Sequence, residues 1–138
     1  MSMYMLDTNV CSFIMRQRPV AVLERLQAAV ERQHSIVISV ITYYEMLLGT
    51  IGRKASPRHA ALVEAFTARF SAILPWERAA AEQAARLRQD LTAKGTPIGG
   101  NDTMIAGHAI AVDCVLVTNN LREFARAEGL RAEDWTTG

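Results

Sequence analysis

The 138-residue sequence contains only two cysteines, Cys11 and Cys114, and each lies among apolar residues. Cysteines in such surroundings are more often buried hydrophobic residues than disulfide partners, and without a CxxC pair nothing supports a zinc site. The chain also lacks an apolar run of membrane-spanning length and a positively charged, apolar leader. These absences predict a soluble protein of a reducing compartment, with the cytoplasm as its expected location and no membrane partner.

Neither sign of charge is in excess, because 15 Lys and Arg stand against 14 Asp and Glu, for a formal net charge of +1. That balance neither requires nor excludes a nucleic-acid partner. Common phosphate-binding and metal-binding motifs are missing too: the chain has no GxxxxGKS/T, GxGxxG or HExxH pattern. Half of the residues are apolar, so the composition predicts one globular domain over residues 1–138.

Short apolar runs alternate with segments of helical periodicity. Strands are expected at residues 3–6, 36–38, 73–74 and 115–117, with a short edge strand between 130 and 135. Helices are expected at residues 10–15, 19–30, 40–49, about 62–70, 77–93, 101–112 and 121–128. Thr8 or Asn9 would cap the first helix, and Ser39 the third. Strands that alternate with helices predict an α/β protein whose parallel sheet is covered on both faces.

Asp7 follows the first apolar run directly and precedes a helix. In open α/β sheets, ligands bind at the carboxyl ends of the strands. A carboxylate at the end of a buried strand is costly to desolvate unless something compensates it. Asp7 is therefore either a cap for the helix that follows or a functional acid, and this residue alone leaves both possibilities open.

Glu45 lies inside a strongly apolar helical segment. One alternative is structural, because Thr42 and Glu45 have the spacing of a capping box. Ser39, directly after the strand, is better placed to begin the helix, and Glu45 then lies deeper in the segment with no basic residue within one helical turn. An acid in such surroundings needs a partner, which favours a functional role.

Asp102 follows a loop that contains Gly99 and Gly100. The structural alternative is an acid in the first helical turn that complements the helix dipole, which is worth about 0.3–1 kcal/mol. The paired glycines would also let a substrate backbone approach closely. Apolar residues after Asp102 place its helix in the core, so the acid itself is expected at the rim of the sheet.

Considered together, these three acids each lie at or soon after a strand-to-helix or loop-to-helix junction. In a parallel sheet with right-handed crossovers, such junctions share one edge. Clustered carboxylates repel one another by about 4 kcal/mol per pair at roughly 4 Å and an effective dielectric of about 20, so protons or a cation must compensate. Mg²⁺ takes a few carboxylates, waters and substrate phosphates as ligands. Such a site can activate water and stabilise a phosphoryl transition state, which suits phosphodiester hydrolysis.

Four segments stand in a characteristic order and spacing. They are residues 5–9 (MLDTN), 39–42 (SVIT) with 45–47 (EML) and Gly49, 97–99 (PIG) with 102–106 (DTMIA), and 116–120 (LVTNN) with 123–124 (EF), followed by LR at 130–131 and EDW at 133–135. In these segments the chain resembles the VapC-type toxins of the PIN-domain ribonucleases, in particular the subgroup of enteric bacteria and their plasmids. The resemblance covers essentially the whole chain.

The resemblance implies a three-layer α/β/α fold around a parallel sheet of strand order 3-2-1-4-5. It implies an endoribonuclease that depends on Mg²⁺ or Mn²⁺ and cleaves structured RNA, with the anticodon stem-loop of initiator tRNA as the expected target. It also implies a toxin that blocks translation, a homodimer, and a VapB-type antitoxin that holds the toxin inactive. Operator DNA would be bound only through that antitoxin.

The resemblance also assigns roles to individual residues. Asp7 and Asp102 become metal ligands, and Glu45 becomes a ligand directly or through water. Thr118 becomes a polar group that supports the ligands or positions water. Asn120 departs from the family, because many members place a fourth aspartate there. The amide puts a second, firmly held metal in doubt, although it could still orient a metal-bound water. Asn120 lies at the exit of a strand expected to neighbour the one before Asp7, so its side chain is expected to face the acids.

Three rival functions remain. An aspartyl phosphatase would need a second aspartate two residues after Asp7, where Asn9 stands. A phosphoacceptor signalling domain would need a lysine after a late strand, and residues 118–120 (TNN) provide none. A non-catalytic module that binds RNA or a protein partner is opposed by the intact acids. An RNA-cleavage assay with added metal separates this last rival from an enzyme.

Overall fold

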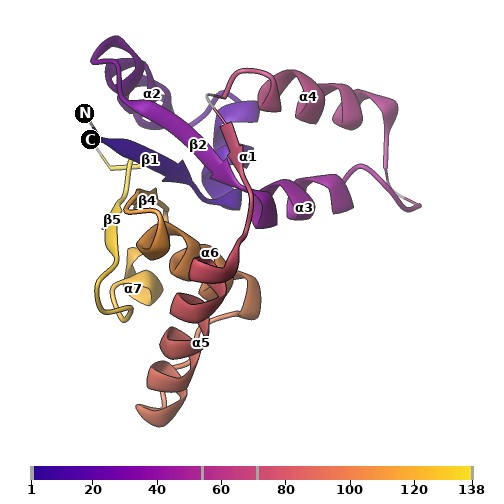
Figure 1. The fold of residues 1–138 in the computed structure, drawn as a ribbon. Coiled ribbons are helices and arrows are strands. Elements are labelled where there is room, and N and C mark those ends of the chain that lie inside the picture. The colour runs from indigo at the N-terminus through magenta and orange to yellow at the C-terminus, as the bar shows by residue number, and fades with distance from the viewer. Residues whose placement is uncertain (1, 54, 71, 138) are drawn as a thin grey trace.

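The computed structural model describes residues 2–53, 55–70 and 72–137 (Figure 1). Its strands are β1 (Met3–Leu6), β2 (Ser35–Ser39), β3 (Ala72–Leu74), β4 (Val115–Val117) and β5 (Arg131–Glu133). Its helices are α1 (Thr8–Met15), α2 (Val20–Glu31), α3 (Val40–Leu48), α4 (Pro57–Thr67), α5 (Arg78–Ala93), α6 (Gly100–Ala111) and α7 (Leu121–Phe124). The alternation of strands and helices predicted from the sequence is confirmed.

The five strands form one parallel sheet in the order β3-β2-β1-β4-β5. This is the strand order that the family resemblance implies. In the centre, Met5 of β1 pairs with Val37 of β2 on one side and with Leu116 of β4 on the other. Because all strands run in the same direction, their carboxyl ends meet at one edge, and the loops that leave them lie close together.

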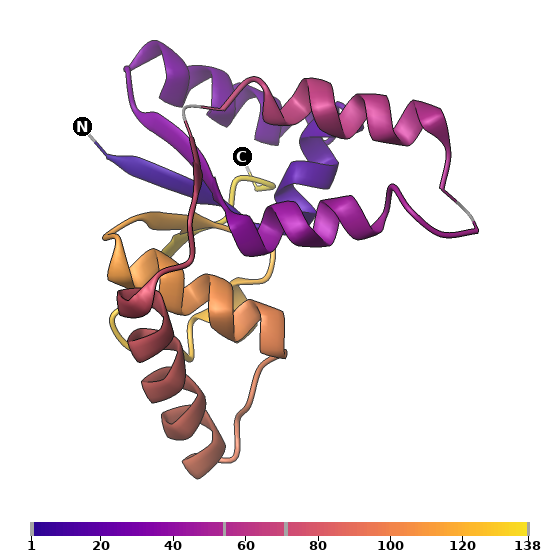
Figure 2. The same cartoon turned by 45° about the vertical axis from the view of Figure 1, so that its right-hand side comes forward.

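Helices cover the sheet on both faces (Figures 1 and 2). Successive residues of the central strand β1 enter opposite cores: Met5 packs with α5 and α6, whereas Leu6 packs with α1, α2 and α4. Both side chains are fully buried. This explains why the inner strands β1 and β4 read as continuous apolar runs with no alternation of polar residues. The three-layer α/β/α architecture is therefore as expected.

Helix α6 packs against α5 at very close range. A Cβ atom added to Gly107 of α6 would lie 2.6 Å from the backbone nitrogen of Ala84 and 2.7 Å from its Cα. Glycine in the middle of a helix is normally unfavourable. Here the absent side chain lets the two helix backbones touch, and this contact sets the position of α6 and of the residues that α6 carries.

Several predicted details of the helices were wrong. Asp7, and neither Thr8 nor Asn9, caps α1, because its carboxylate reaches the free amide of Val10 and the helix already begins at Thr8. Pro19 is the residue before α2 and not part of its first turn.

Two predicted helices end earlier in the structure than expected. Helix α4 ends at Thr67, so Phe70 lies beyond it. Helix α7 ends at Phe124 and does not reach residue 128, because the amides of Arg126 and Ala127 bond to carbonyls only three residues back and tighten the chain into turns.

In the part of the chain that the structure describes, no helix combines the length and the apolar character needed to cross a membrane.

Candidate active site

The polar residues singled out in the sequence lie around the carboxyl edge of the sheet. Asp7 follows β1 directly, and its amide donates to the carbonyl of Val117 at the end of β4. Thr118 follows β4, and Glu45 lies in the helix that starts at the end of β2. Asp102 lies in the first turn of α6. The charges of Asp7, Glu45 and Asp102 act on one another, so the predicted cluster of three acids does form.

Asp7 is the buried centre of this cluster, with only 5% of its surface exposed. Burial raises the pKa of Asp7 from 3.8 to about 6, against hydrogen bonds from the Thr118 side chain and the Val10 amide, which lower it. The negative charges of Asp102 and Glu45 raise it further. The carboxylate is therefore held in a position where a proton or a cation is strongly favoured. Asp7 is both a helix cap and an acid with a raised pKa, so its structural role does not exclude a functional one.

Glu45 is oriented by the first residue of α1. The hydroxyl of Thr8 donates to Oε1 of Glu45 at 2.5 Å. Ser39 caps α3 by accepting from the amide of Ile41, so Glu45 is not part of a capping box with Thr42. The capping-box role considered for Glu45 is thereby removed, and its side chain is turned toward the start of α1, the helix that Asp7 caps.

Asp102 is half-buried, and its carboxylate accepts no hydrogen bond from the residues described. Burial raises the pKa of Asp102, and the charges of Glu45 and Glu123 raise it further. A Cβ on Gly99 would approach only Oδ2 of Asp102, at 3.6 Å, and one on Gly100 would meet nothing within 4 Å. The paired glycines thus leave open space beside the acid, as expected for a loop that a substrate backbone can approach.

Glu123 is a fourth acid of the cluster that the sequence analysis did not assign to the site. It lies in α7, near enough to raise the pKa of Asp102. The side-chain Nδ2 of Asn120 donates to Oε2 of Glu123 at 2.9 Å. Like the three predicted acids, Glu123 lies at or soon after a junction that leads into a helix, and this shared position was the signal that could have identified it. The charge that Asn120 lacks is therefore supplied three residues later.

Asn120 and Thr118 form a connected pair at the exit of β4. Thr118 is fully buried, and its hydroxyl accepts from the backbone N–H of Asn120 at 3.0 Å. It also contributes the hydrogen bond that lowers the pKa of Asp7. Asn120 was expected to face the acids directly. In the structure its side chain contacts Glu123, so it reaches the cluster through that residue.

The donor set fits a hard divalent cation. All the groups at the site are oxygen ligands, the type that Mg²⁺ and Mn²⁺ prefer. As the side chains stand in residues 2–53, 55–70 and 72–137, no three acidic, histidine or cysteine groups enclose a metal position. Glu45 and Glu123 are instead turned onto Thr8 and Asn120. The charges predict a cation, and closure around it requires these side chains to move.

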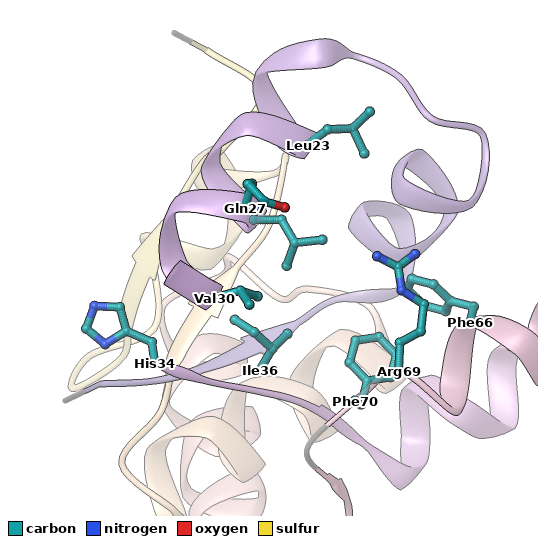
Figure 3. Close-up of a pocket in the computed structure, with 9 residues that line it drawn as sticks. Leu23, Gln27, Val30, His34, Ile36, Phe66, Arg69 and Phe70 are labelled. Atoms are coloured by element: carbon teal, nitrogen blue, oxygen red, sulfur yellow. The ribbon is translucent and has the colours of Figure 1, made fainter. Parts of the chain in front are cut away.

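A large hollow lies elsewhere, between α2, β2 and α4 (Figure 3). It has a volume of about 550 Å³ and is lined mainly by apolar side chains such as Leu26, Ile36 and Phe66, with Arg69 at its side. None of the four acids lines it. The acidic cluster and this hollow are therefore separate features of the molecule.

Comparison with known proteins agrees with this geometry. The PIN domain family matches residues 4–130. The tRNA(fMet)-specific endonucleases VapC of Shigella flexneri and Salmonella typhimurium are 39% and 42% identical to the chain, over 96% of its length and 98% and 97% of theirs.

Solved structures show the same fold. VapBC2 from Rickettsia felis, bound to a DNA fragment from its promoter, matches with a TM-score of 0.88 and 33% identity over 96% of this chain and 98% of that chain. DNA-bound VapBC from Salmonella typhimurium matches with a TM-score of 0.86 and 42% identity over 98% and 99%. The fold, the family match and the sequence similarity over nearly the full length agree: this chain belongs to the PIN-domain family and, within it, to the VapC ribonucleases.

Proposed function

We propose that this chain is the toxin of a toxin–antitoxin pair and that it cleaves the anticodon stem-loop of initiator tRNA with the help of Mg²⁺ or Mn²⁺. The observation that carries the proposal is the cluster of Asp7, Glu45 and Asp102 at the carboxyl edge, with Asp7 held at a pKa of about 6. Relatives of 39% and 42% identity are tRNA(fMet)-specific endonucleases, which supports this substrate.

In this mechanism the acids hold the metal and orient the attacking water. Asp7 and Asp102 would contact the cation directly, and Glu45 would contact it directly or through water. When bound, the divalent cation polarises the scissile phosphate and lowers the pKa of a water. Thr118 keeps Asp7 in place, and the open space beside Gly99 and Gly100 admits the RNA backbone.

Asn120 has a supporting role in this proposal. Its side chain holds Glu123, whose charge acts on Asp102, so Asn120 shapes the site without adding charge. An amide offers both an acceptor and donors, so Asn120 could also orient a metal-bound water.

The biological setting follows from the solved relatives, which are VapBC complexes bound to DNA. We extend that arrangement to this chain: a VapB-type antitoxin would cover the acids and keep the toxin inactive in the cytoplasm. The toxin itself would be a homodimer and would contact operator DNA only through the antitoxin.

A cleavage assay tests the enzyme. Protein freed of antitoxin should cut initiator tRNA with Mg²⁺ or Mn²⁺ and should stop when a chelator is in excess. Asp102→Asn should lower the cleavage rate by about a hundredfold or more, because the amide keeps the shape of the side chain and removes the charge that the metal needs.

Two results would count against the proposal. Full cleavage in excess chelator would remove the metal from the mechanism. Equal cleavage of initiator and elongator tRNAs at matched concentration would remove the proposed substrate, while leaving the ribonuclease activity in place.

A further inference from the structure

His108 is a buried titratable residue that the mechanism above does not use. It lies in the last turn of α6, with 1% of its surface exposed. Its Nδ1 atom is 2.8 Å from the hydroxyl oxygen of Ser39, which is itself fully buried at the end of β2. The two residues are 69 positions apart in the sequence. A polar pair this deep in a core costs stability unless its groups are bonded to each other.

The protonation states of this pair follow from its other contacts. The oxygen of Ser39 already accepts from the amide of Ile41 at 3.0 Å, so its own proton is free to be donated. Burial lowers the pKa of His108, and the carbonyl of Pro75 and the charge of Glu77 oppose that effect only in part. The lowered pKa favours the neutral imidazole, and we assign the tautomer with the proton on Nε2, in which Nδ1 accepts from Ser39.

The ring of His108 also lies near the segment that follows β3. The carbonyl of Pro75 faces the ring closely enough to favour a protonated nitrogen, although Nε2 makes no hydrogen bond of ordinary geometry with the residues described. The next residue, Trp76, donates its indole N–H to the carbonyl of Met104 on α6 at 3.0 Å. Trp76 thus ties the β3–α5 connection to α6, and His108 ties α6 to the end of β2.

The contact between His108 and Ser39 joins the two helices that carry acids on either side of Asp7. Ser39 is the cap of α3, which carries Glu45, and His108 belongs to α6, which carries Asp102. Among the described residues it is the only hydrogen bond between α6 and the β2–α3 segment. Glu45 and Asp102 are near enough for their charges to repel, and this repulsion acts to separate the two helices.

We propose that His108 is a positioning residue for the acidic site: bonded to Ser39, it holds α6 against the start of α3, so that Asp102 and Glu45 remain at the separation that a shared cation requires. This inference rests on the proposed metal-dependent function. A small displacement of a catalytic group is enough to lower a rate strongly, because the reacting groups must be aligned.

A matched pair of substitutions separates this role from simple packing. His108→Asn places an amide oxygen near the position of Nδ1 and keeps an acceptor for Ser39. His108→Leu has nearly the shape of asparagine but no acceptor. If His108 only filled space, the leucine variant would be the more stable and the less impaired of the two, because leucine is apolar and favours helix more than asparagine does.

The measurements are kcat and KM for cleavage of initiator tRNA, and binding of Mn²⁺ alone by calorimetry. We expect His108→Leu to lower kcat and the Mn²⁺ affinity by about tenfold each with little change in KM, as for other residues that orient metal ligands. His108→Asn should recover most of both values even if it melts at a lower temperature than His108→Leu.

Each outcome is decisive. The inference is overturned if His108→Leu keeps the kcat and Mn²⁺ affinity of the unmodified protein, or if the two variants are impaired equally. If His108→Leu does not fold, His108→Met, which also lacks a strong acceptor, replaces it under the same criteria. Failure of the unmodified protein to bind Mn²⁺ or to cleave RNA would instead refute the proposed function on which the inference rests.

Discussion

At the scale of the residue, Asp7 shows how one side chain can be both structural and chemical. Its carboxylate caps α1 through the amide of Val10, which favours the charged form. Burial and the charges of Asp102 and Glu45 favour the neutral form and dominate, so the pKa rises to about 6. A cation bound at the site would neutralise this charge, whereas the metal-free protein must bear it.

The first prediction concerns the stability of the metal-free protein. The pKa of Asp7 is about 6 in the folded state and 3.8 in the unfolded state, so the folded state binds this proton more tightly. The stability that this proton provides is fully present below about pH 3.8. As pH rises from there through about 6, the free energy of unfolding falls by up to about 3 kcal/mol. Asp7→Asn cannot ionise and keeps an oxygen for Val10. It should therefore raise the free energy of unfolding at pH 7.5, and much less at pH 4.5.

Urea denaturation in the presence of a chelator at both pH values measures this difference. An equal gain at the two pH values would show that ionisation of Asp7 is not its source. The same variant should be inactive in RNA cleavage, so that stability and activity change in opposite directions.

At the scale of the element, the position of α6 decides where Asp102 lies. The helix is fixed from two sides, by the close backbone contact between Gly107 and Ala84 of α5 and by the bond from His108 to Ser39. Neither contact lies at the acids themselves. The geometry of the site therefore depends on packing in the middle and at the end of a helix whose first turn carries the functional residue.

The second prediction tests the contact between α5 and α6. Gly107→Ala should destabilise the protein by about 1–3 kcal/mol, because the new methyl group would lie 2.6–2.7 Å from atoms of Ala84 and the helices must separate. Alanine is the better helix former, so propensity alone predicts the opposite sign. Gly100→Ala is the matched control: a Cβ there meets nothing within 4 Å, and stability should be unchanged or slightly higher. Comparable effects of the two substitutions in urea denaturation would contradict the packing argument.

At the scale of the whole molecule, the parallel sheet gathers residues from distant parts of the chain. Asp7, Glu45, Asp102 and Glu123 come from four different segments, and what they share is a place after a junction at the same edge. Helices fill both faces of the sheet, so this edge is where an RNA strand can reach the acids. The substrate and the antitoxin would then compete for the same part of the surface.

The third prediction concerns the action of the intact molecule in a cell. Expressed alone in a bacterial host, the chain should stop growth, and Glu45→Gln should relieve the arrest at equal protein level. Glutamine keeps an acceptor for Thr8 and loses only the charge, and Ser39 remains the cap of α3, so the fold should be intact. Growth curves after induction, with the protein level followed by immunoblot, provide the measurement. Undiminished arrest by this variant would return Glu45 to a structural role.

The sequence by itself determined the order of strands and helices, the parallel sheet and three of the four acids. These features are local: an apolar run that ends at Asp7, or a cap such as Ser39 directly after a strand, is visible within a few residues. The strand order and the family came from segments matched along the whole chain; the structure confirms the strand order, and the comparisons confirm the family.

Tertiary structure alone decided how the side chains of the site are paired. Thr8 meets Glu45 across 37 positions, and Ser39 meets His108 across 69. The amide of Asn120 turns to Glu123, which brings a fourth acid to the cluster and was not foreseen. Local periodicity fixes which face of an element is buried, but the partner of a polar group depends on which other element is packed against it. That partner is set only when the helices close over the sheet.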